Sequence, residues 1–190
     1  MKQFLFLIYK RFLTWVGDLY FATEPPKVRW LNVEQLLEKA EVGDIVCRGY
    51  DSYVDGYFIP GEFSHSGLVV GKNEVTHAVA EGVSNVSLGD FVIDTDRFIL
   101  LRPDYKFGKG VQKAIDQAIW YRVNKTEYDF MFREGLNEVY CHEFTASCLN
   151  EAGVVVPRIE KEFGVWPFKF VKKIYLADSF IPVSNEIYRF

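Results

Sequence analysis

The stretch "EFSHSGLVVGKNEVTHAV", residues 62–79, decides the fold of this chain because it places two histidines on one hairpin. Two apolar, β-branched runs flank the turn residues Gly71-Lys72-Asn73, which is typical of two antiparallel strands joined by a tight loop. His65 stands at the start of the first strand, and His77 lies within the second. A lone histidine in such a place is usually a core residue, so the question is whether the two imidazoles meet.

The length of the loop decides whether they meet, because side chains alternate between the two faces of a sheet. With a three-residue loop, Val70 would face Glu74. Gly67 would then face His77, and His65 would share the face of His77. A two-residue loop would send the two histidines to opposite faces. Their convergence therefore depends on the three-residue loop.

Composition indicates a globular chain without affinity for nucleic acid. The 190 residues are 49% hydrophobic and 17% aromatic, which is enough for one sizeable core. The formal net charge of -4 offers no basic surface to DNA or RNA, so we expect no nucleic-acid partner. The odd number of cysteines fits neither a disulfide framework nor a C-x-x-C zinc pair. We therefore expect reduced thiols and a cytoplasmic location.

Residues 1–24 form a segment of their own that ends at Pro25-Pro26. Their apolar run is broken by Lys10-Arg11, so it is too short for a signal sequence or a membrane span. The pattern predicts an amphipathic helix, which would either pack on the rest of the chain or lie on a membrane surface. We treat residues 30–190 as a single domain.

The rest of the chain predicts an α+β fold. Residues 31–40 read as a short helix capped by Asn32, and residues 110–119 have helical spacing. A further helix is expected from Asn137 to Ala152, ended by Gly153. Between these helices lie short apolar runs separated by Gly, Asn and Asp, which predict a curled antiparallel sheet: residues 45–47, 68–70, 75–79, 86–88 and 98–101.

Cys141 is the candidate nucleophile because it falls in the first turns of the helix predicted from Asn137. Unpaired N–H groups at a helix start stabilise a thiolate. Cys148 lies deeper along the same face, and Cys47 lies in a run of strand character, so both are expected to be buried and inert. Taken alone, Cys141 could also be a core residue, since cysteine is among the most buried residue types.

Four motifs together resemble a known family. They are "GDIV" at 43–46, "SHSGLVVG" at 64–71, "VTHAVAEGV" at 75–83, and the pair "YDFMF" at 128–132 with "EVYCHEF" at 138–144. Their order is similar to that of the circularly permuted, papain-like branch of the NlpC-type amidase superfamily. This branch includes YiiX-like proteins, a poxvirus group and the lecithin:retinol acyltransferase relatives. The resemblance implies a papain-like fold in which the histidine strand precedes the nucleophile helix.

The resemblance also implies the roles of the site residues. Cys141 would be the nucleophile, His65 the general base and His77 the third residue, which orients the base. This fits the chemistry of a cysteine hydrolase, in which a neighbouring imidazole activates the thiol. No metal or other cofactor is implied. His142 departs from the family pattern, in which a small residue often follows the nucleophile.

Three further residues near the nucleophile are candidates for substrate binding. Tyr128 and Tyr140 match family motif positions, although filling of the aromatic core is the more common role of tyrosines in such positions. Glu143 could orient the site or pair with the helix start. Each of the three therefore keeps a structural alternative.

Three classes of function follow from these residues. The first is a thiol hydrolase of amide bonds, with a small peptide or a peptidoglycan fragment as substrate. The second is an acyltransferase or thioesterase that acts on lipid or acyl substrates at a membrane surface, to which residues 1–24 would bind. The third is a non-catalytic binding module, or a zinc site formed by His65, His77 and Cys141. The sequence leaves the scissile bond and the oligomeric state open.

Overall fold

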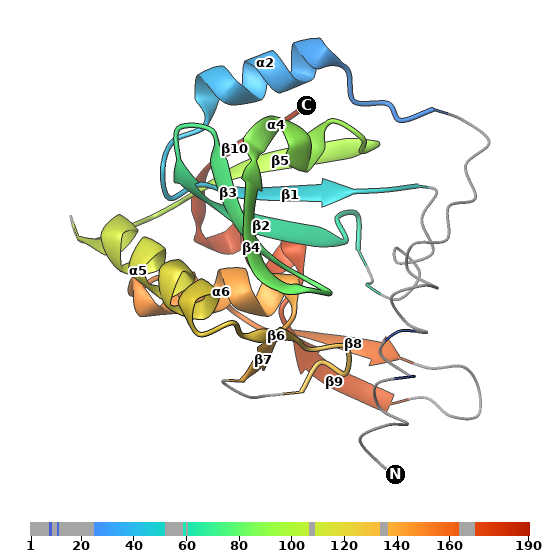
Figure 1. The fold of residues 1–190 in the computed structure, drawn as a ribbon, viewed down its shortest axis with the longest axis vertical. Helices are drawn as coiled ribbons and strands as arrows, with labels where there is room; N and C mark the ends of the chain where they lie inside the picture. Colours follow the sequence, from blue (N-terminus) through green and yellow to red (C-terminus); the bar gives the residue numbers. More distant parts are fainter. Residues whose placement is uncertain are drawn as a thin grey trace.

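A six-stranded antiparallel sheet with the strand order β10-β5-β1-β2-β3-β4 forms the centre of the fold (Figure 1). The structure is a computed structural model, and it describes residues 8, 11, 25–51, 59, 61–106, 109–133, 137–163 and 170–190. The helix predicted for residues 1–24 lies outside this part, apart from Ile8 and Arg11. The strands are β1 (Ile45–Gly49), β2 (His65–Gly71), β3 (Glu74–Val79), β4 (Gly82–Ser87), β5 (Arg97–Pro103) and β10 (Ser184–Arg189).

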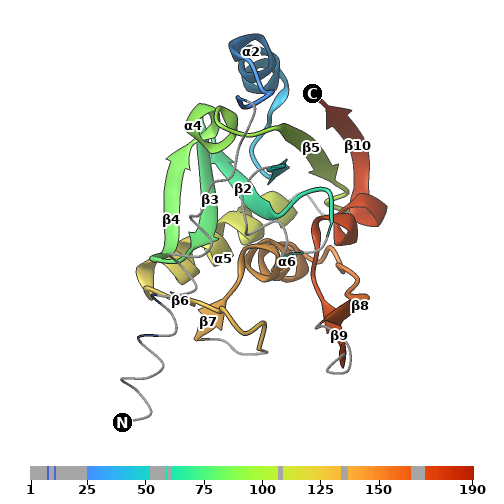
Figure 2. The same cartoon turned by 90° about the vertical axis from the view of Figure 1, so that its right-hand side faces the viewer.

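Helices cover both faces of the sheet, as Figure 2 shows. On one face, α2 (Trp30–Lys39) and α4 (Leu88–Val92) pack against Val46, Val69 and Val75. On the other face, α5 (Gly110–Val123) and α6 (Cys141–Glu151) pack against side chains of opposite parity, such as Leu68. This arrangement confirms the predicted α+β fold with an antiparallel sheet. Among the described helices, none has the length and hydropathy needed to cross a membrane.

The hairpin of β2 and β3 brings the two histidines to one face by a different route from the one predicted. Gly67 pairs with His77 as predicted, but Gly71, not Val70, pairs with Glu74. The loop thus has two residues, and the register shifts between Val69 and Gly71 at a β-bulge. A bulge adds one residue to one strand, so it restores the parity that a two-residue loop would have inverted.

Two predicted helix starts are wrong. The helix predicted from Asn137 begins at Cys141, because β7 (Glu138–Val139) is held extended by its parallel pairing with β6 (Glu127–Tyr128). Cys141 is consequently the first residue of α6. The helix α2 begins at Trp30, and Asn32 lies inside it, where the Asn32 side chain accepts a hydrogen bond from Arg29 N at 3.0 Å.

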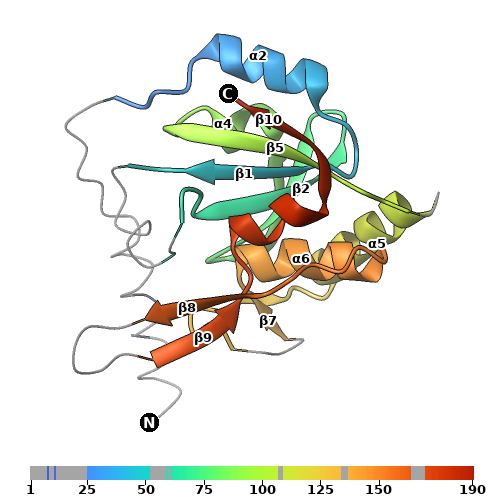
Figure 3. The same ribbon diagram turned by 180° about the vertical axis from the view of Figure 1, so that it is seen from behind.

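The chain after Pro157 returns to the body of the domain, as Figure 3 shows from behind. It forms the hairpin of β8 (Ile159–Phe163) and β9 (Phe170–Ile174) and two short 3-10 turns, η1 (Ala177–Ser179) and η2 (Ile181–Val183). Strand β10 then pairs with β5 at the edge of the main sheet.

Candidate functional site

The two hairpin histidines are hydrogen-bonded to each other. The distance from His65 Nε2 to His77 Nδ1 is 2.8 Å, and the two rings meet edge to face at 80°. Both rings also contact Phe91 of α4, with centroid distances of 5.5 and 5.4 Å. Gly67 makes room for this packing, because a Cβ atom there would lie 2.4 Å from Val75 Cγ1.

Burial keeps both imidazoles neutral. Desolvation holds the pKa of His65 well below its usual value and lowers the pKa of His77 to about 4. The positive charge of Arg48 adds to both shifts. A neutral imidazole has one nitrogen that accepts a proton, which is what a general base requires.

Cys141 lies against the backbone that immediately precedes His65. Its thiol donates a hydrogen bond to Ser64 O at a distance of 3.6 Å, and the Tyr128 hydroxyl is 4.0 Å from the Cys141 Sγ. The sulfur is buried at the first residue of α6, where the helix dipole favours a thiolate. The structure therefore gathers the thiol, the start of β2 and a tyrosine hydroxyl in one place.

The other two cysteines do not lie at a helix start, although Cys47 is close enough to Cys141 for their charges to interact. Cys47 packs in the core between β1 and α6, and Cys148 lies two turns along α6, where both are fully buried. Burial raises the pKa of both thiols well above the usual value. Cys141 is equally buried but lies at the start of α6, which neither of these thiols does, so both fit the inert roles expected for them.

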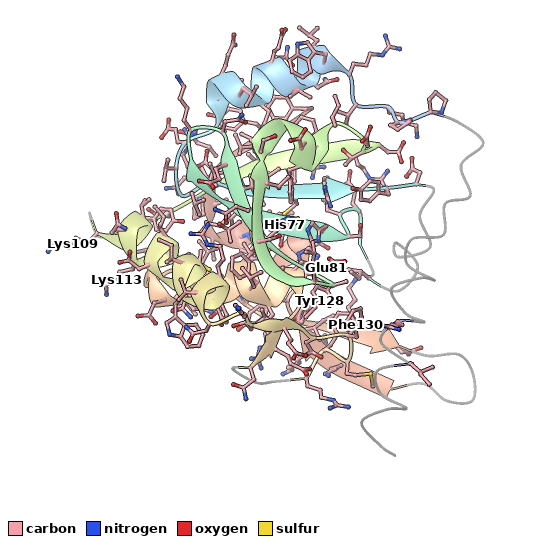
Figure 4. All side chains as sticks on the ribbon, viewed as in Figure 1. His77, Glu81, Lys109, Lys113, Tyr128 and Phe130 are labelled. Carbon is pink, nitrogen blue, oxygen red and sulfur yellow. The ribbon has the colours of Figure 1, made fainter. Side chains whose placement is uncertain are left out.

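The three candidate substrate-binding residues occupy different environments. Tyr128 presents its hydroxyl to the thiol, whereas the Tyr140 hydroxyl accepts a hydrogen bond from Tyr175 N at 2.7 Å and is buried. The placement of Tyr140 favours the structural interpretation, since it joins α6 to the chain that follows β9. Glu143 is half-buried in the first turn of α6. Burial raises the pKa of Tyr140, and the charge of Glu143 adds to that shift. In Figure 4, His77 on β3 and Tyr128 on β6 lie toward the same side of the domain.

A second polar cluster, which the sequence did not indicate, lies behind the nucleophile. Ser66 follows His65, so its side chain points to the opposite face of the sheet, toward α6. Ser66 Oγ is 2.8 Å from His142 Nδ1 and 3.0 Å from Thr145 Oγ1. Both hydroxyls also donate to Cys141 O, at 3.3 Å from Ser66 and 3.1 Å from Thr145. These bonds fasten the first turn of α6 to β2.

His142, the departure from the family pattern, is thus a buried member of this second cluster. Its ring is fully buried, and desolvation lowers its pKa to about 3, although the Phe63 carbonyl opposes the shift. Its Nε2 forms no hydrogen bond of acceptable geometry within the described part of the chain. His142 therefore contributes to the packing behind the nucleophile.

The ring nitrogens of His65 and His77 are not arranged as ligands of one zinc ion. His65 Nε2 and His77 Nδ1 face each other and share one proton, so neither nitrogen points at a common third position. Among the described residues, no group of three His, Cys, Asp or Glu side chains is arranged to hold a metal ion.

Comparison with known proteins gives one match. A family model described as "Permuted papain-like amidase enzyme, YaeF/YiiX, C92 family" matches residues 39–168. The matched residues include both histidine strands and the whole of α6. No curated protein and no solved structure matches the chain.

Proposed function

This chain belongs to the C92 family of permuted papain-like amidases, a family of cysteine peptidases, and from that premise we propose that it cleaves amide bonds through an acyl-enzyme on Cys141. His65 serves as the base, and His77 orients it. The observation that carries the proposal is the hydrogen-bonded imidazole pair at the start of β2, next to the residue whose carbonyl contacts the thiol.

The hydrogen bond between the histidines indicates which nitrogen of His65 accepts the thiol proton. With His65 Nε2–H donating to His77 Nδ1, the lone pair of His65 Nδ1 is available to take the thiol proton. His77 then stabilises the imidazolium that forms. This is the role that a third residue has in thiol and serine hydrolases.

The reaction would proceed in two halves. The Cys141 thiolate attacks the carbonyl carbon, and the π electrons move to the oxygen. The proton on His65 Nδ1 passes to the amide nitrogen as the C–N bond breaks, which leaves a thioester. Water then attacks the thioester with His65 as base, and the acid and the thiol are released. The Cys141 N–H, at the start of α6, and the Tyr128 hydroxyl are the donors that we place on the oxyanion.

One observation favours acyl transfer to another nucleophile as a second candidate. Cys141 belongs to an apolar cluster with Tyr140, Ile174 and Leu176, against which Tyr128 and Phe132 also pack. Such surroundings would suit an apolar acyl group and would limit the access of water to a thioester. A membrane role for residues 1–24 stays a prediction, because it falls outside the described residues.

Mass-spectrometric mapping of alkylation by iodoacetamide tests the proposal. Cys141 should react first and should remain reactive below the ordinary thiol pKa of about 8.5. His65→Ala should remove this advantage, while Cys47 and Cys148 serve as slow internal controls. Equal labelling of all three cysteines would defeat the catalytic assignment of Cys141.

A further inference from the structure

Arg48 occupies a position on β1 where the sheet is otherwise apolar. The residues on either side of it along the strand are buried, and the face that it shares with Val46 is the core beneath α2 and α4. Its partner across the ladder is His65, so the two side chains leave the sheet on the same face. Cβ atoms of such partners lie about 5 Å apart. A guanidinium therefore stands beside the imidazole pair.

The guanidinium is fixed in place by aromatic rings. Its Nη1 donates to Phe91 O at 2.7 Å, and its Cζ lies 4.5 Å from the centre of the Phe91 ring and 5.4 Å from that of Tyr50. Phe91 is also the ring that contacts both histidines. The guanidinium of Arg48 is thus close to both imidazoles. Its positive charge adds to the effect of burial in lowering the pKa of each histidine.

Arg48 has no counter-ion among the residues that the structure describes. Other arginines in the same part of the chain have one: Arg97 pairs with Asp51 and Arg102 with Asp44. Within the described part of the chain, the hydrogen bond of Arg48 goes to the Phe91 carbonyl, and its Nε is buried without a hydrogen-bond partner. A partly buried charge is normally paired, because desolvation without compensation is costly.

We propose that Arg48 binds an oxyanion group of the substrate, so that the preferred substrates carry a carboxylate or phosphate close to the scissile amide. This inference rests on the proposed function, because it assumes that chemistry occurs at Cys141. The planar fork of a guanidinium matches such groups, and a stacked arginine loses little freedom on binding them. The missing counter-ion is then supplied by the substrate.

The test compares two alkylating reagents at Cys141, iodoacetate, which is anionic, and iodoacetamide, which is neutral. Both reagents need the same thiolate, so the ratio of their rates cancels any change in the protonation of Cys141 or His65. Arg48→Gln should lower the iodoacetate-to-iodoacetamide ratio by about tenfold at low ionic strength, and Arg48→Lys should retain most of it. Arg122→Gln, which makes the same change of net charge on the exposed face of α5, should leave the ratio unchanged.

A second measurement covers the case in which Arg48→Gln does not fold. In the wild type, N-acetylglycine and methyl phosphate are compared with uncharged N-acetylglycinamide as protectants of Cys141 against iodoacetamide. At least one anion should protect Cys141 at a concentration about tenfold lower than N-acetylglycinamide does. The anion that protects at the lower concentration shows whether Arg48 prefers a carboxylate or a phosphate. Equal protection by all three, or equal ratios in wild type and folded Arg48→Gln, would overturn the role of Arg48. Slow labelling of wild-type Cys141 by iodoacetamide would instead defeat the proposed function itself.

Discussion

Lowering the pH from 7.5 to 5.0 should destabilise the folded chain, because His77 and His142 are buried as neutral rings. The pKa is about 4 for His77 and about 3 for His142 in the folded chain. In the unfolded chain both pKa values return to about 6.5. Below that value the unfolded chain binds protons that the folded chain does not, so the free energy of unfolding falls as the pH falls. The loss begins near pH 6.5 and continues down to the folded pKa of each ring.

The expected loss follows from these pKa values. At pH 5.0, the unfolded pKa of each histidine lies about 1.5 units above the pH, so proton binding by each unfolded ring lowers the free energy of unfolding by about 2 kcal/mol. The two histidines together therefore lower the free energy of unfolding by about 4 kcal/mol. The lowered pKa of the half-buried His65 acts in the same direction. A domain of this size is stable by roughly 5–15 kcal/mol, so the effect is large.

Urea unfolding followed by tryptophan fluorescence at pH 7.5 and pH 5.0 measures the loss directly. His142→Gln removes one titrating ring and should reduce the difference between the two pH values by about 2 kcal/mol. Burial raises the pKa of Asp44, which works in the opposite direction, but the comparison between wild type and His142→Gln cancels that contribution. A free energy of unfolding that is the same at both pH values would refute the assignment of His77 and His142 as buried neutral rings.

Three other substitutions test separate parts of the site. Tyr128→Phe should lower the rate of amide hydrolysis by about 10²–10³, with little change in the alkylation of Cys141, if the hydroxyl binds the oxyanion; a parallel fall in alkylation would contradict that role. Gly67→Ala places a Cβ 2.4 Å from Val75 Cγ1 and should cost about 1–3 kcal/mol in urea unfolding, so a neutral result would show that the packing can yield. Ser66→Ala removes the hydroxyl shared by His142, Thr145 and Cys141 O and should also cost about 1–3 kcal/mol, with unchanged stability as the contrary outcome.

The pairing of His65 with His77 was predictable in outcome and not in detail. Alternation along a strand is a local property, so the sequence predicts that the rings share a face with a three-residue loop and lie on opposite faces with a two-residue loop. The loop has two residues, and the bulge beyond Val69, which depends on how β2 pairs with its neighbours, is what keeps the rings on one face. The start of α6 differs from the prediction for a similar reason, since β7 is held extended by pairing with residues eleven positions earlier in the chain.

The cluster of Ser66, His142 and Thr145 could not have been found by pattern. Ser66 and His142 are 76 residues apart in the chain, and neither has a spacing that marks it. Arg48 directly follows the apolar run 45–47, and its role depends on the register that places it opposite His65. The roles of these residues follow from contacts with residues that are distant in the sequence, and no local pattern indicates such contacts.

The bulge in β2 fixes the register that keeps the two imidazoles on one face. Val70 is the extra residue of the bulge, so deleting it would leave Val69 opposite Val75 and Gly71 opposite Glu74 in a regular two-residue hairpin, with Gly67 still opposite His77. Inserting one residue between Val75 and His77 would instead place His77 opposite Ser66, on the face away from His65. Deletion of the bulged residue ought therefore to be tolerated where an insertion into the neighbouring strand is not, a difference that a library of single-residue deletions and insertions would reveal.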